Sequence, residues 1–423
     1  MVVTADEITI SYRVTSGPNF IATYAATAGL AYDESDEDWA RTTEGLVEYF
    51  NANFQLYGRK LRVERTEGQG SVVDEIFGAG QAEANNDALR VADETLAFAD
   101  MSAFSQPYAE ALSRQGIINF GAPYLSREWF GRQQPYAWSL LTDCSVIAET
   151  GSEYMLRRLV DRPASFAGDD LAGRQRKVAV IAPDNPEYQE CVAASSEVLQ
   201  DAGRRFDLVL DYNLDLASLQ PQAATLLGRL RNDGITTVAC ACDPVMLLFL
   251  TRGAEAQGYQ PEWEVLGVGF TDLDLIAQGY ATELSGDQWS RAFGISYAAQ
   301  PVPFRESPGY QAYRSVRDDE PSQFVDLLYH QLYALVIGIQ MAGPELSPES
   351  FEAGLFAYPG GSGVAGTWEW GPEHHTPQVD AREVWWDPAA TSGFNGERGS
   401  YRGGAERFRR GEWPAGDPEV FGR

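Results

Sequence analysis

Residues 176–203 read RKVAVIAPDNPEYQECVAASSEVLQDAG, and this stretch decides the fold. The apolar run at 178–182 predicts a short strand, and the polar residues at 183–186 predict a turn. A helix with an apolar face is expected to follow and to end at Gly203. This order is one strand–turn–helix unit of a parallel sheet. Its turn lies at the carboxyl end of the strand, where open α/β sheets bind ligands.

Similar units form two groups along the chain. Strands and helices alternate over residues 8–120 and again over residues 145–267, so each group predicts a parallel sheet. A long helix is expected over 323–342. The Gly- and Arg-rich tail from residue 391 has no periodic apolar face and is expected to wrap around the protein. Because 423 residues are too many for one simple core, we expect two lobes that face each other across a cleft.

The balance of charges limits the classes of partner. Lys plus Arg number 32 and Asp plus Glu number 61, which gives a net charge of −29 at pH 7. Such an acidic surface repels nucleic acid phosphates and anionic lipids, so neither is an expected partner. No apolar run reaches the roughly 20 residues of a membrane helix. The start at Met1 has no signal-peptide pattern. We expect either a cytosolic protein or an exported one whose leader has been removed, and the abrupt start before a strand favours the second.

The four cysteines give information on whether the protein is exported or cytosolic. An even number suits an exported protein with one or two disulfides, and equally a cytosolic protein with buried thiols. Cys240 and Cys242 lack the two-residue spacer of zinc and redox motifs, so neither chemistry is expected. If that segment is a strand, both side chains point to the same face and need separate partners, for which Cys144 and Cys191 are the candidates.

Metal binding and catalysis have weak support. His374 and His375 are adjacent and are expected on an exposed hairpin turn, where they make a poor chelate. The acidic run 33–38 lacks the glycine and spacing of a calcium loop, so we expect a solvated loop or a helix start. Nucleophilic catalysis would need a Gly-x-Ser-x-Gly elbow or a Cys–His pair, and the three histidines are far in sequence from every cysteine. We therefore expect no metal, no cofactor and no enzymatic activity.

Five short motifs follow one another along the chain. They are Ser16-Gly17-Pro18 after the first strand, Tyr57-Gly58-Arg59-Lys60-Leu61, Gln106-Pro107 opening a helix that ends at Gly116-Ile117, Asn185-Pro186-Glu187-Tyr188, and Asp243-Pro244. In their order and spacing the chain resembles, over nearly its whole length, the type I periplasmic solute-binding proteins. These are the branched-chain amino acid-binding group of ABC transporters.

The resemblance implies an α/β fold of two Rossmann-like lobes joined by a hinge of three crossovers, with the ligand in the cleft. Lobe one would comprise residues 1–142 and 299–362. Lobe two would comprise residues 143–298 and 363–423, including the C-terminal wrap. The three crossovers are expected near residues 141–144, 297–300 and 360–366.

The same resemblance implies a function. We expect an extracytoplasmic protein, in the periplasm or on the outer face of the cytoplasmic membrane, where a lipid anchor is also compatible. It would be a monomer that captures a small polar or amphipathic molecule, such as an amino acid-like compound, an amide or an aromatic acid. Hinge closure would then present this ligand to the permease subunits of an ABC importer. The alternatives are a ligand-sensing ectodomain of the same fold and, less favoured, a hydrolase.

The family pattern also points to residues in lobe one. Ser102 matches the serine that takes the ligand carboxylate together with backbone N–H groups, and residues 122–125 match a second anchoring loop. The chain departs from the pattern in that loop, because Leu125 is apolar and Pro123 lacks a backbone donor.

In lobe two, Tyr188 matches the family tyrosine. The acid that takes the ligand amine falls near Cys242 and Asp243, so an amine ligand is retained only if Asp243 stands there. These departures weigh against a plain α-amino acid. The turns after the strands supply the polar groups and apolar walls that a cleft ligand needs, although any one aromatic among them is alternatively a core residue. The candidate ligand-binding residues are Tyr24, Ser102, Ala103, Phe104, Tyr124, Trp138, Tyr188, Asp243 and Phe270.

Overall fold

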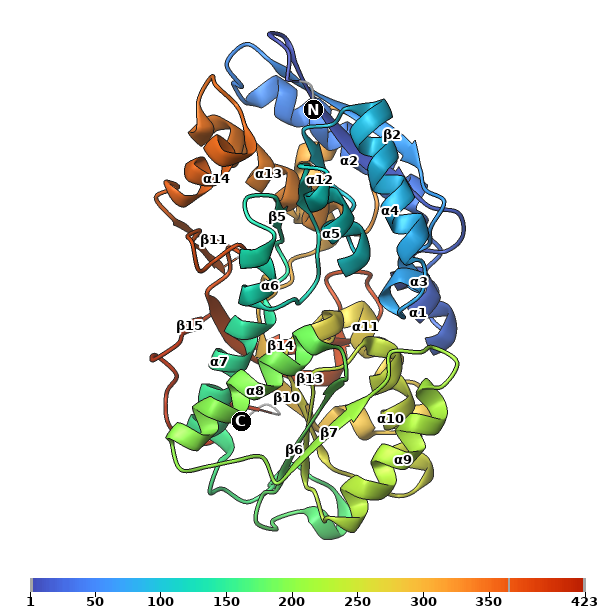
Figure 1. Ribbon diagram of the computed structural model, residues 1–423. Coiled ribbons are helices and arrows are strands. Elements are labelled where there is room, and N and C mark those ends of the chain that lie inside the picture. Colours follow the sequence, from blue (N-terminus) through green and yellow to red (C-terminus); the bar gives the residue numbers. More distant parts are fainter. Residues whose placement is uncertain (1–2, 364–365, 421–423) are drawn as a thin grey trace.

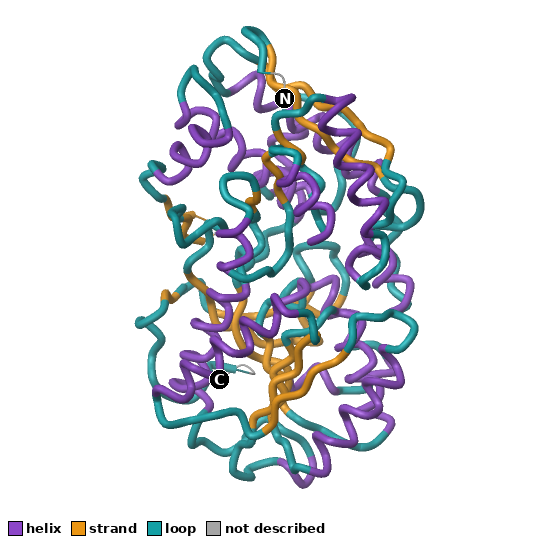
Figure 2. The backbone as a smooth tube through the Cα atoms, viewed as in Figure 1, coloured by secondary structure: helices purple, strands orange, loops and turns teal. Residues whose placement is uncertain are grey.

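The computed structural model describes residues 3–363 and 366–420, which form two lobes, one above the other in Figure 1. The N-terminal end lies at the outer edge of the upper lobe, and the C-terminal end lies in the lower lobe. Figure 2 shows the strands of the lower lobe running between layers of helices. The α/β architecture with parallel sheets, expected from the alternating pattern, is confirmed.

Lobe one contains a parallel five-stranded sheet in the order β2-β1-β3-β4-β5. β1 is buried along most of its length because it pairs with a strand on each edge, β2 and β3, and helices cover its faces. The strands are β1 (Glu7–Val14), β2 (Lys60–Glu67), β3 (Ala99–Asp100), β4 (Ile118–Phe120) and β5 (Ala137–Trp138). The helices are α1 (Phe20–Ala28), α2 (Asp36–Asn53), α3 (Val72–Ile76), α4 (Gln81–Arg90), α5 (Gln106–Arg114), α6 (Arg127–Arg132), α12 (Pro308–Arg314), α13 (Val325–Ala342) and α14 (Pro348–Phe356).

Lobe two contains the larger sheet, in the order β14-β13-β10-β9-β8-β6-β7, with β15 paired to β13. The pairs from β7 to β10 are parallel, and β13 joins antiparallel to β10. The strands are β6 (Val178–Pro183), β7 (Leu208–Tyr212), β8 (Thr237–Cys240), β9 (Glu262–Val265), β10 (Ala292–Ser296), β13 (Asp380–Thr391), β14 (Arg398–Gly403) and β15 (Phe408–Arg409). The helices are α7 (Cys144–Tyr154), α8 (Pro186–Asp201), α9 (Leu219–Asn232), α10 (Pro244–Ala256) and α11 (Asp274–Tyr280).

Polar caps start the helices that face the cleft. Ser105, Asn185 and Asp243 each follow a strand and accept a hydrogen bond from a backbone N–H in the first turn of α5, α8 or α10. The acidic run at 33–38 is the start of α2, where Ser35 forms a capping box with Asp38. These caps direct the N-termini of helices from both lobes toward the space between the lobes.

The C-terminal tail differs from the expected wrap, because it adds strands to the lobe-two sheet. β14 pairs antiparallel with β13, and β15 pairs with the start of β13. The sequence did not predict these strands, because it is charged and rich in glycine and has no local strand pattern. They form through their pairing with β13. Residues 421–423, the end of the tail, lie outside the described residues.

The third passage between the lobes comes later in the chain than expected. The predicted range 360–366 includes residues 364–365, which lie outside the described residues. The Trp368 ring lies against Tyr333 of α13, and Trp370 contacts Trp138 of β5, so both still belong to lobe one. The chain enters the second sheet only at β13, after the short hairpin of β11 (Gly361–Gly363) and β12 (Gly366–Trp368).

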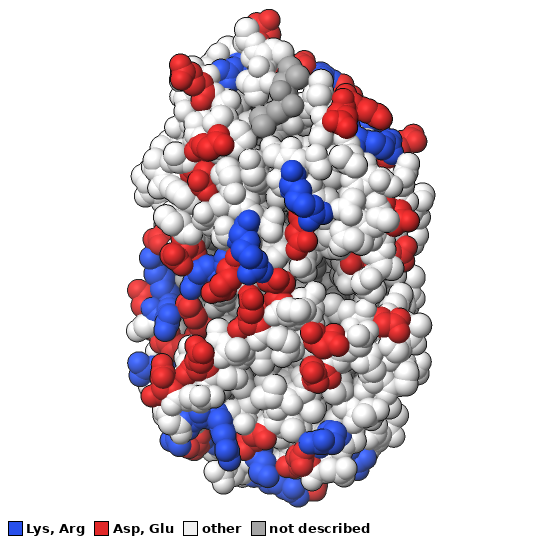
Figure 3. Space-filling model, in the orientation of Figure 1, with Lys and Arg blue, Asp and Glu red and all other residues white. Residues whose placement is uncertain are grey.

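The face drawn in Figure 3 carries Asp and Glu over both lobes, and Lys or Arg lies beside many of them. Ion pairs bridge the lobes on this acidic protein, as Arg132 of α6 and Glu187 of α8 show at 2.7 Å. On another edge, the Arg252 guanidinium of α10 donates to the backbone carbonyl groups of Thr27 and Ala28. The lobes are therefore tied together around the space between them.

Candidate functional site

A cavity of about 680 Å³ lies between the two lobes. Its walls include the segments that follow β1, β2, β3 and β4 in lobe one and β6, β7, β8 and β9 in lobe two. This is the carboxyl-end placement expected for a ligand site between parallel sheets. We refer to it as the large cavity.

Five of the candidate residues contribute to the wall of the large cavity. They come from both lobes and are mostly aromatic, which gives the cavity an amphipathic lining. They are Phe104, Tyr124, Tyr188, Asp243 and Phe270.

The other four candidates are buried behind the wall, and none lines the cavity. The Ser102 hydroxyl donates to Asp100 and accepts from the Arg13 backbone N–H, each at 2.8 Å. The Tyr24 hydroxyl donates to the carbonyl of Ile276. These hydroxyls are occupied by partners within the fold, and Ala103 and Trp138 are fully buried.

Asp243 has a structural role that limits what it offers a ligand. One carboxylate oxygen accepts the N–H groups of Val245 and Met246, and the other accepts the Tyr212 hydroxyl at 2.6 Å. Burial raises the pKa of Asp243, although these hydrogen bonds act in the opposite direction. Asp243 therefore faces the cavity as a helix cap that is already hydrogen-bonded.

Tyr188, by contrast, presents an uncommitted hydroxyl. It stands in the first turn of α8 and lines the cavity. Within residues 3–363 and 366–420 its hydroxyl forms no hydrogen bond, and burial raises its pKa. The neutral hydroxyl can donate to or accept from a ligand.

Two residues that the sequence did not single out add polar groups. Asn19 is buried in the wall, and its amide nitrogen has no hydrogen-bond acceptor in the described structure. Asp36, in the first turn of α2, uses one oxygen to accept from Thr15 and keeps the other free of donors among the residues described. The motif at 16–18 and the acidic run at 33–38 marked these turns, but not their convergence on one cavity.

All charged residues that line the large cavity are acidic. The described lining contains no Lys, Arg or His. A ligand carboxylate would therefore be held by neutral donors such as backbone N–H groups and the Asn19 amide. The acidic residues are Asp36, Glu75, Glu110, Asp184, Asp215 and Asp243.

Tyr124 and Phe270 separate the large cavity from a smaller one of about 270 Å³, because both line both spaces. Tyr124 comes from lobe one and Phe270 from lobe two. Their rings meet edge to face with centroids 5.7 Å apart. We call the smaller space the hinge chamber, since the passages between the lobes contribute to its wall.

Comparison with known proteins decides the family. The model of the periplasmic binding protein family matches residues 24–391. The chain belongs to this family. Its type I fold, which the sequence motifs indicated, is confirmed, and members of the family are extracytoplasmic ligand-binding proteins rather than enzymes.

Solved structures of periplasmic binding proteins share the fold at low identity. One is the solute-binding protein of an R. palustris ABC transporter in complex with 4-hydroxybenzoate, at 12% identity and a TM-score of 0.66, covering 96% of this chain and 99% of that one. Another is the branched-chain amino acid ABC transporter protein of Thermus thermophilus with bound valine, at 13% and 0.64, covering 96% and 97%. A substrate-binding protein from Aeropyrum pernix has 15% identity and a TM-score of 0.62, with 96% of each chain covered. No curated protein matches.

The disulfides of this binding protein differ from the expected pairing. Cys144 pairs with Cys191 and Cys240 pairs with Cys242, whereas separate partners were expected for the last two. The expectation was wrong because β8 ends at Cys240, so Cys242 lies in the turn beyond the strand. The described residues contain no free cysteine.

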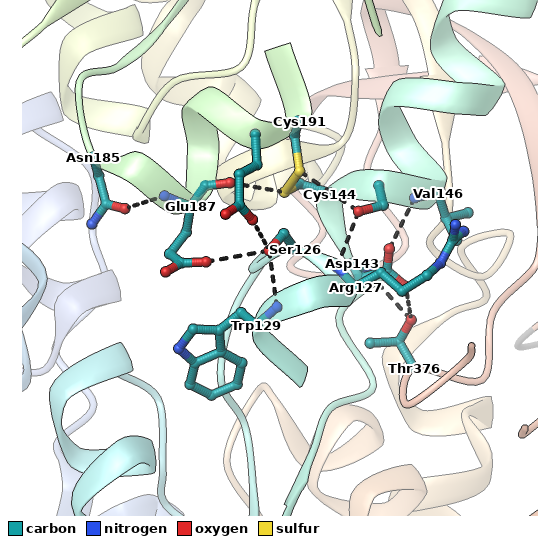
Figure 4. The surroundings of a disulfide bond; sticks show 12 residues. Ser126, Arg127, Trp129, Asp143, Cys144, Val146, Asn185, Glu187, Cys191 and Thr376 are labelled. Atoms are coloured by element: carbon teal, nitrogen blue, oxygen red, sulfur yellow. Dashed lines mark hydrogen bonds between the residues drawn. A yellow bond between two sulfur atoms is a disulfide. The ribbon is translucent and has the colours of Figure 1, made fainter. Parts of the chain in front are cut away.

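The bond between Cys144 and Cys191 joins the first turn of α7 to α8, next to the contact between the lobes (Figure 4). Ser126 of lobe one points toward this region and donates to Glu190 at 2.7 Å. On the other side, Asp143 caps α7 and accepts the Thr376 hydroxyl. The disulfide therefore holds the α8 face that carries Tyr188.

The histidine pair also differs from expectation. His375 is buried rather than exposed, and its ring stacks with Phe130 and lies against Trp138. Burial lowers the pKa of His375 to about 4, which keeps the ring neutral. Over the described ranges, no cluster of three or more potential metal ligands occurs, and no helix is long and apolar enough to cross a membrane.

Proposed function

We propose that this protein captures a small amphipathic solute in the large cavity and closes its two lobes around it. The observation that carries the proposal is the construction of the cavity from strand-end turns of both lobes. Phe104 and Tyr124 contribute from lobe one, and Tyr188, Asp243 and Phe270 from lobe two. A solute in this position would contact both lobes and stabilise the closed arrangement.

The closed form would then be recognised by the permease subunits of an ABC importer. This part of the proposal is supported by family membership and by two solved relatives that belong to ABC transporters. The ligands in those structures, 4-hydroxybenzoate and valine, both combine an apolar body with a carboxylate. The aromatic wall of the large cavity suits an apolar body, whereas the surplus of acids favours amides or other solutes with donor groups.

Thermal-shift screening with amino acids, amides, short peptides and aromatic acids tests the proposal. A ligand at 100 times its dissociation constant should stabilise the protein by about 2.7 kcal/mol. Tyr188→Ala should weaken the binding of the hit. Tyr136→Ala is the matched control, because Tyr136 is half-buried in the same way but does not line the cavity. Equal affinity in wild type and Tyr188→Ala would contradict the assignment of the site.

A further inference from the structure

The hinge chamber contains a buried arginine without a full set of partners. Arg382 projects from β13 and lines this chamber, and it is 2% exposed. Its Nε donates a long hydrogen bond of 3.4 Å to the carbonyl of Ala298. In the part of the chain that the structure describes, no carboxylate forms an ion pair with the guanidinium, and its two terminal nitrogens have no acceptor.

Such a group is costly to bury. A guanidinium carries five N–H donors, and a buried charge is normally paired and hydrogen-bonded. Burial lowers the pKa of Arg382 to about 10. This shift indicates that the acids in its surroundings compensate the charge only in part. The side chain is therefore positioned for an acceptor that the chain itself does not supply.

The acids of the chamber are already engaged. Asp272 accepts the Ser296 hydroxyl at 2.7 Å, and burial raises the pKa of Asp272, which favours its neutral form. Asp274 accepts from Ser392, Ser400 and the backbone of Tyr401. Asp326 accepts the N–H of Gly309 at 2.6 Å. None of these carboxyl groups accepts a hydrogen bond from the terminal guanidinium nitrogens of Arg382.

The remaining groups in the wall are mainly apolar or neutral. His330, the other basic residue that lines the chamber, has its Nδ1 within hydrogen-bond distance of the backbone carbonyl of Asp326. The apolar wall includes Leu141, Val302, Phe304, Phe324 and Phe394. A volume of about 270 Å³ is sufficient for a small organic molecule, and the single guanidinium fixes where its polar end would lie.

We propose that the hinge chamber is a second binding site, for a small carboxylate with an apolar body, and that Arg382 holds the carboxylate through its planar fork. Bidentate pairing with a carboxylate is the geometry that a guanidinium favours. The apolar body would lie against Leu141, Val302 and Phe324. This site does not depend on which solute occupies the large cavity.

Occupancy of the chamber should be linked to the arrangement of the lobes. Gln323 and His330 belong to lobe one, whereas Asp272 and Arg382 belong to lobe two, and all four line the same space. A carboxylate bound there contacts both lobes, so it favours the arrangement in which they are together. The chamber is thus a place where a second molecule can change the affinity of the large cavity.

A series of three probes with one ring and different charge tests the proposal. We expect benzoate to raise the melting temperature of the wild-type protein, benzamide to do so less and benzylamine not at all. In Arg382→Met the benzoate shift should disappear. In Arg229→Met it should remain, because Arg229 is an exposed residue of α9 outside both cavities. Benzamide or benzylamine matching benzoate, or a full benzoate shift in Arg382→Met, would overturn the proposal.

Two further variants locate the site and control for folding. Tyr188→Ala should keep the benzoate shift, whereas loss of the shift there and retention in Arg382→Met would assign benzoate to the large cavity. Without ligand, Arg382→Met should melt no lower than wild type, because it removes an incompletely paired buried charge. If Arg382→Met fails to fold, Arg382→Lys decides the question. This variant keeps the positive charge but lacks the planar guanidinium that pairs with a carboxylate through two N–H groups. It should weaken benzoate binding by about tenfold or more.

Discussion

The backbone N–H of Phe270 donates a hydrogen bond of 3.0 Å to the Tyr124 hydroxyl, and this bond joins the two lobes between the large cavity and the hinge chamber. Both residues have a positive φ, 54° for Tyr124 and 59° for Phe270, which is unfavourable for aromatic side chains. The surrounding loops impose this conformation on both partners. The contact is therefore a specific feature of the interface between the lobes.

Tyr124→Phe should weaken the association of the lobes while leaving the aromatic contact in place. The variant removes one hydrogen bond from a buried pair, which is worth about 1 kcal/mol, or about fivefold in the closing equilibrium. The population of open molecules can be measured by small-angle scattering with and without ligand. Tyr136→Phe, outside both cavities, should leave the scattering profile unchanged. A Tyr124→Phe profile identical to wild type would show that this bond does not hold the lobes together.

The strand-end turns were predictable because their signals are local. Tyr188 and Asp243 follow strands that the apolar runs 178–182 and 236–240 mark, and both line the cavity. Ser102 also follows a strand, but its hydroxyl turns inward to Asp100, a choice that depends on the neighbouring strand β1. Local pattern thus locates a turn but not the direction of each side chain in it.

The hinge chamber could not be predicted, because its parts are far apart in the sequence. Arg382 meets Asp272 and Gln323 only through the pairing of β13 with β10 and the packing of α13 on lobe one. β13 itself was missed, since a charged strand that contains a proline has no simple alternation. The signal that remains in the sequence is an arginine two residues after Asp380, which by itself is typical of any exposed strand.

Removing the disulfide between Cys144 and Cys191 should destabilise the protein much more than removing the one between Cys240 and Cys242. The first closes a loop with a sequence separation of 47, and its loss should cost about 4 kcal/mol on the chain-entropy estimate. The second spans a separation of 2, so the same estimate gives less than about 2 kcal/mol. Urea unfolding of the two double alanine variants measures both. Equal losses would contradict the entropic explanation.

Salt should stabilise this protein at neutral pH. A net charge of −29 repels itself in the compact state, and the screening length falls from about 10 Å at 0.1 M to about 3 Å at 1 M salt. The melting temperature should therefore rise between 0.1 M and 1 M KCl at pH 7. Near pH 4.4, the isoelectric point of the sequence, the rise should be much smaller. A similar rise at both pH values would point to an effect of salt on apolar burial instead.

Glu264 of β9 should make the stability fall as the pH rises. The carboxyl is 3% exposed, neither oxygen has a hydrogen-bond partner in the described structure, and burial raises its pKa to about 8 from an ordinary value of 4.5. Between these two values the folded protein keeps the proton and the unfolded chain releases it, so the free energy of unfolding decreases with rising pH. The loss attributable to this group is at most about 5 kcal/mol, is absent below pH 4.5 and is complete above pH 8.

In Glu264→Gln the slope of unfolding free energy against pH should flatten between pH 4.5 and pH 8, and the variant should exceed wild type in unfolding free energy at pH 8.5. Urea titrations at several pH values measure this, with the exposed Glu197→Gln as the control that should retain the wild-type slope. Other buried acids act in the same direction in both proteins, so the difference between the variant and wild type isolates the effect of Glu264. An unchanged slope in Glu264→Gln would show that the Glu264 carboxyl is ionised in the folded protein.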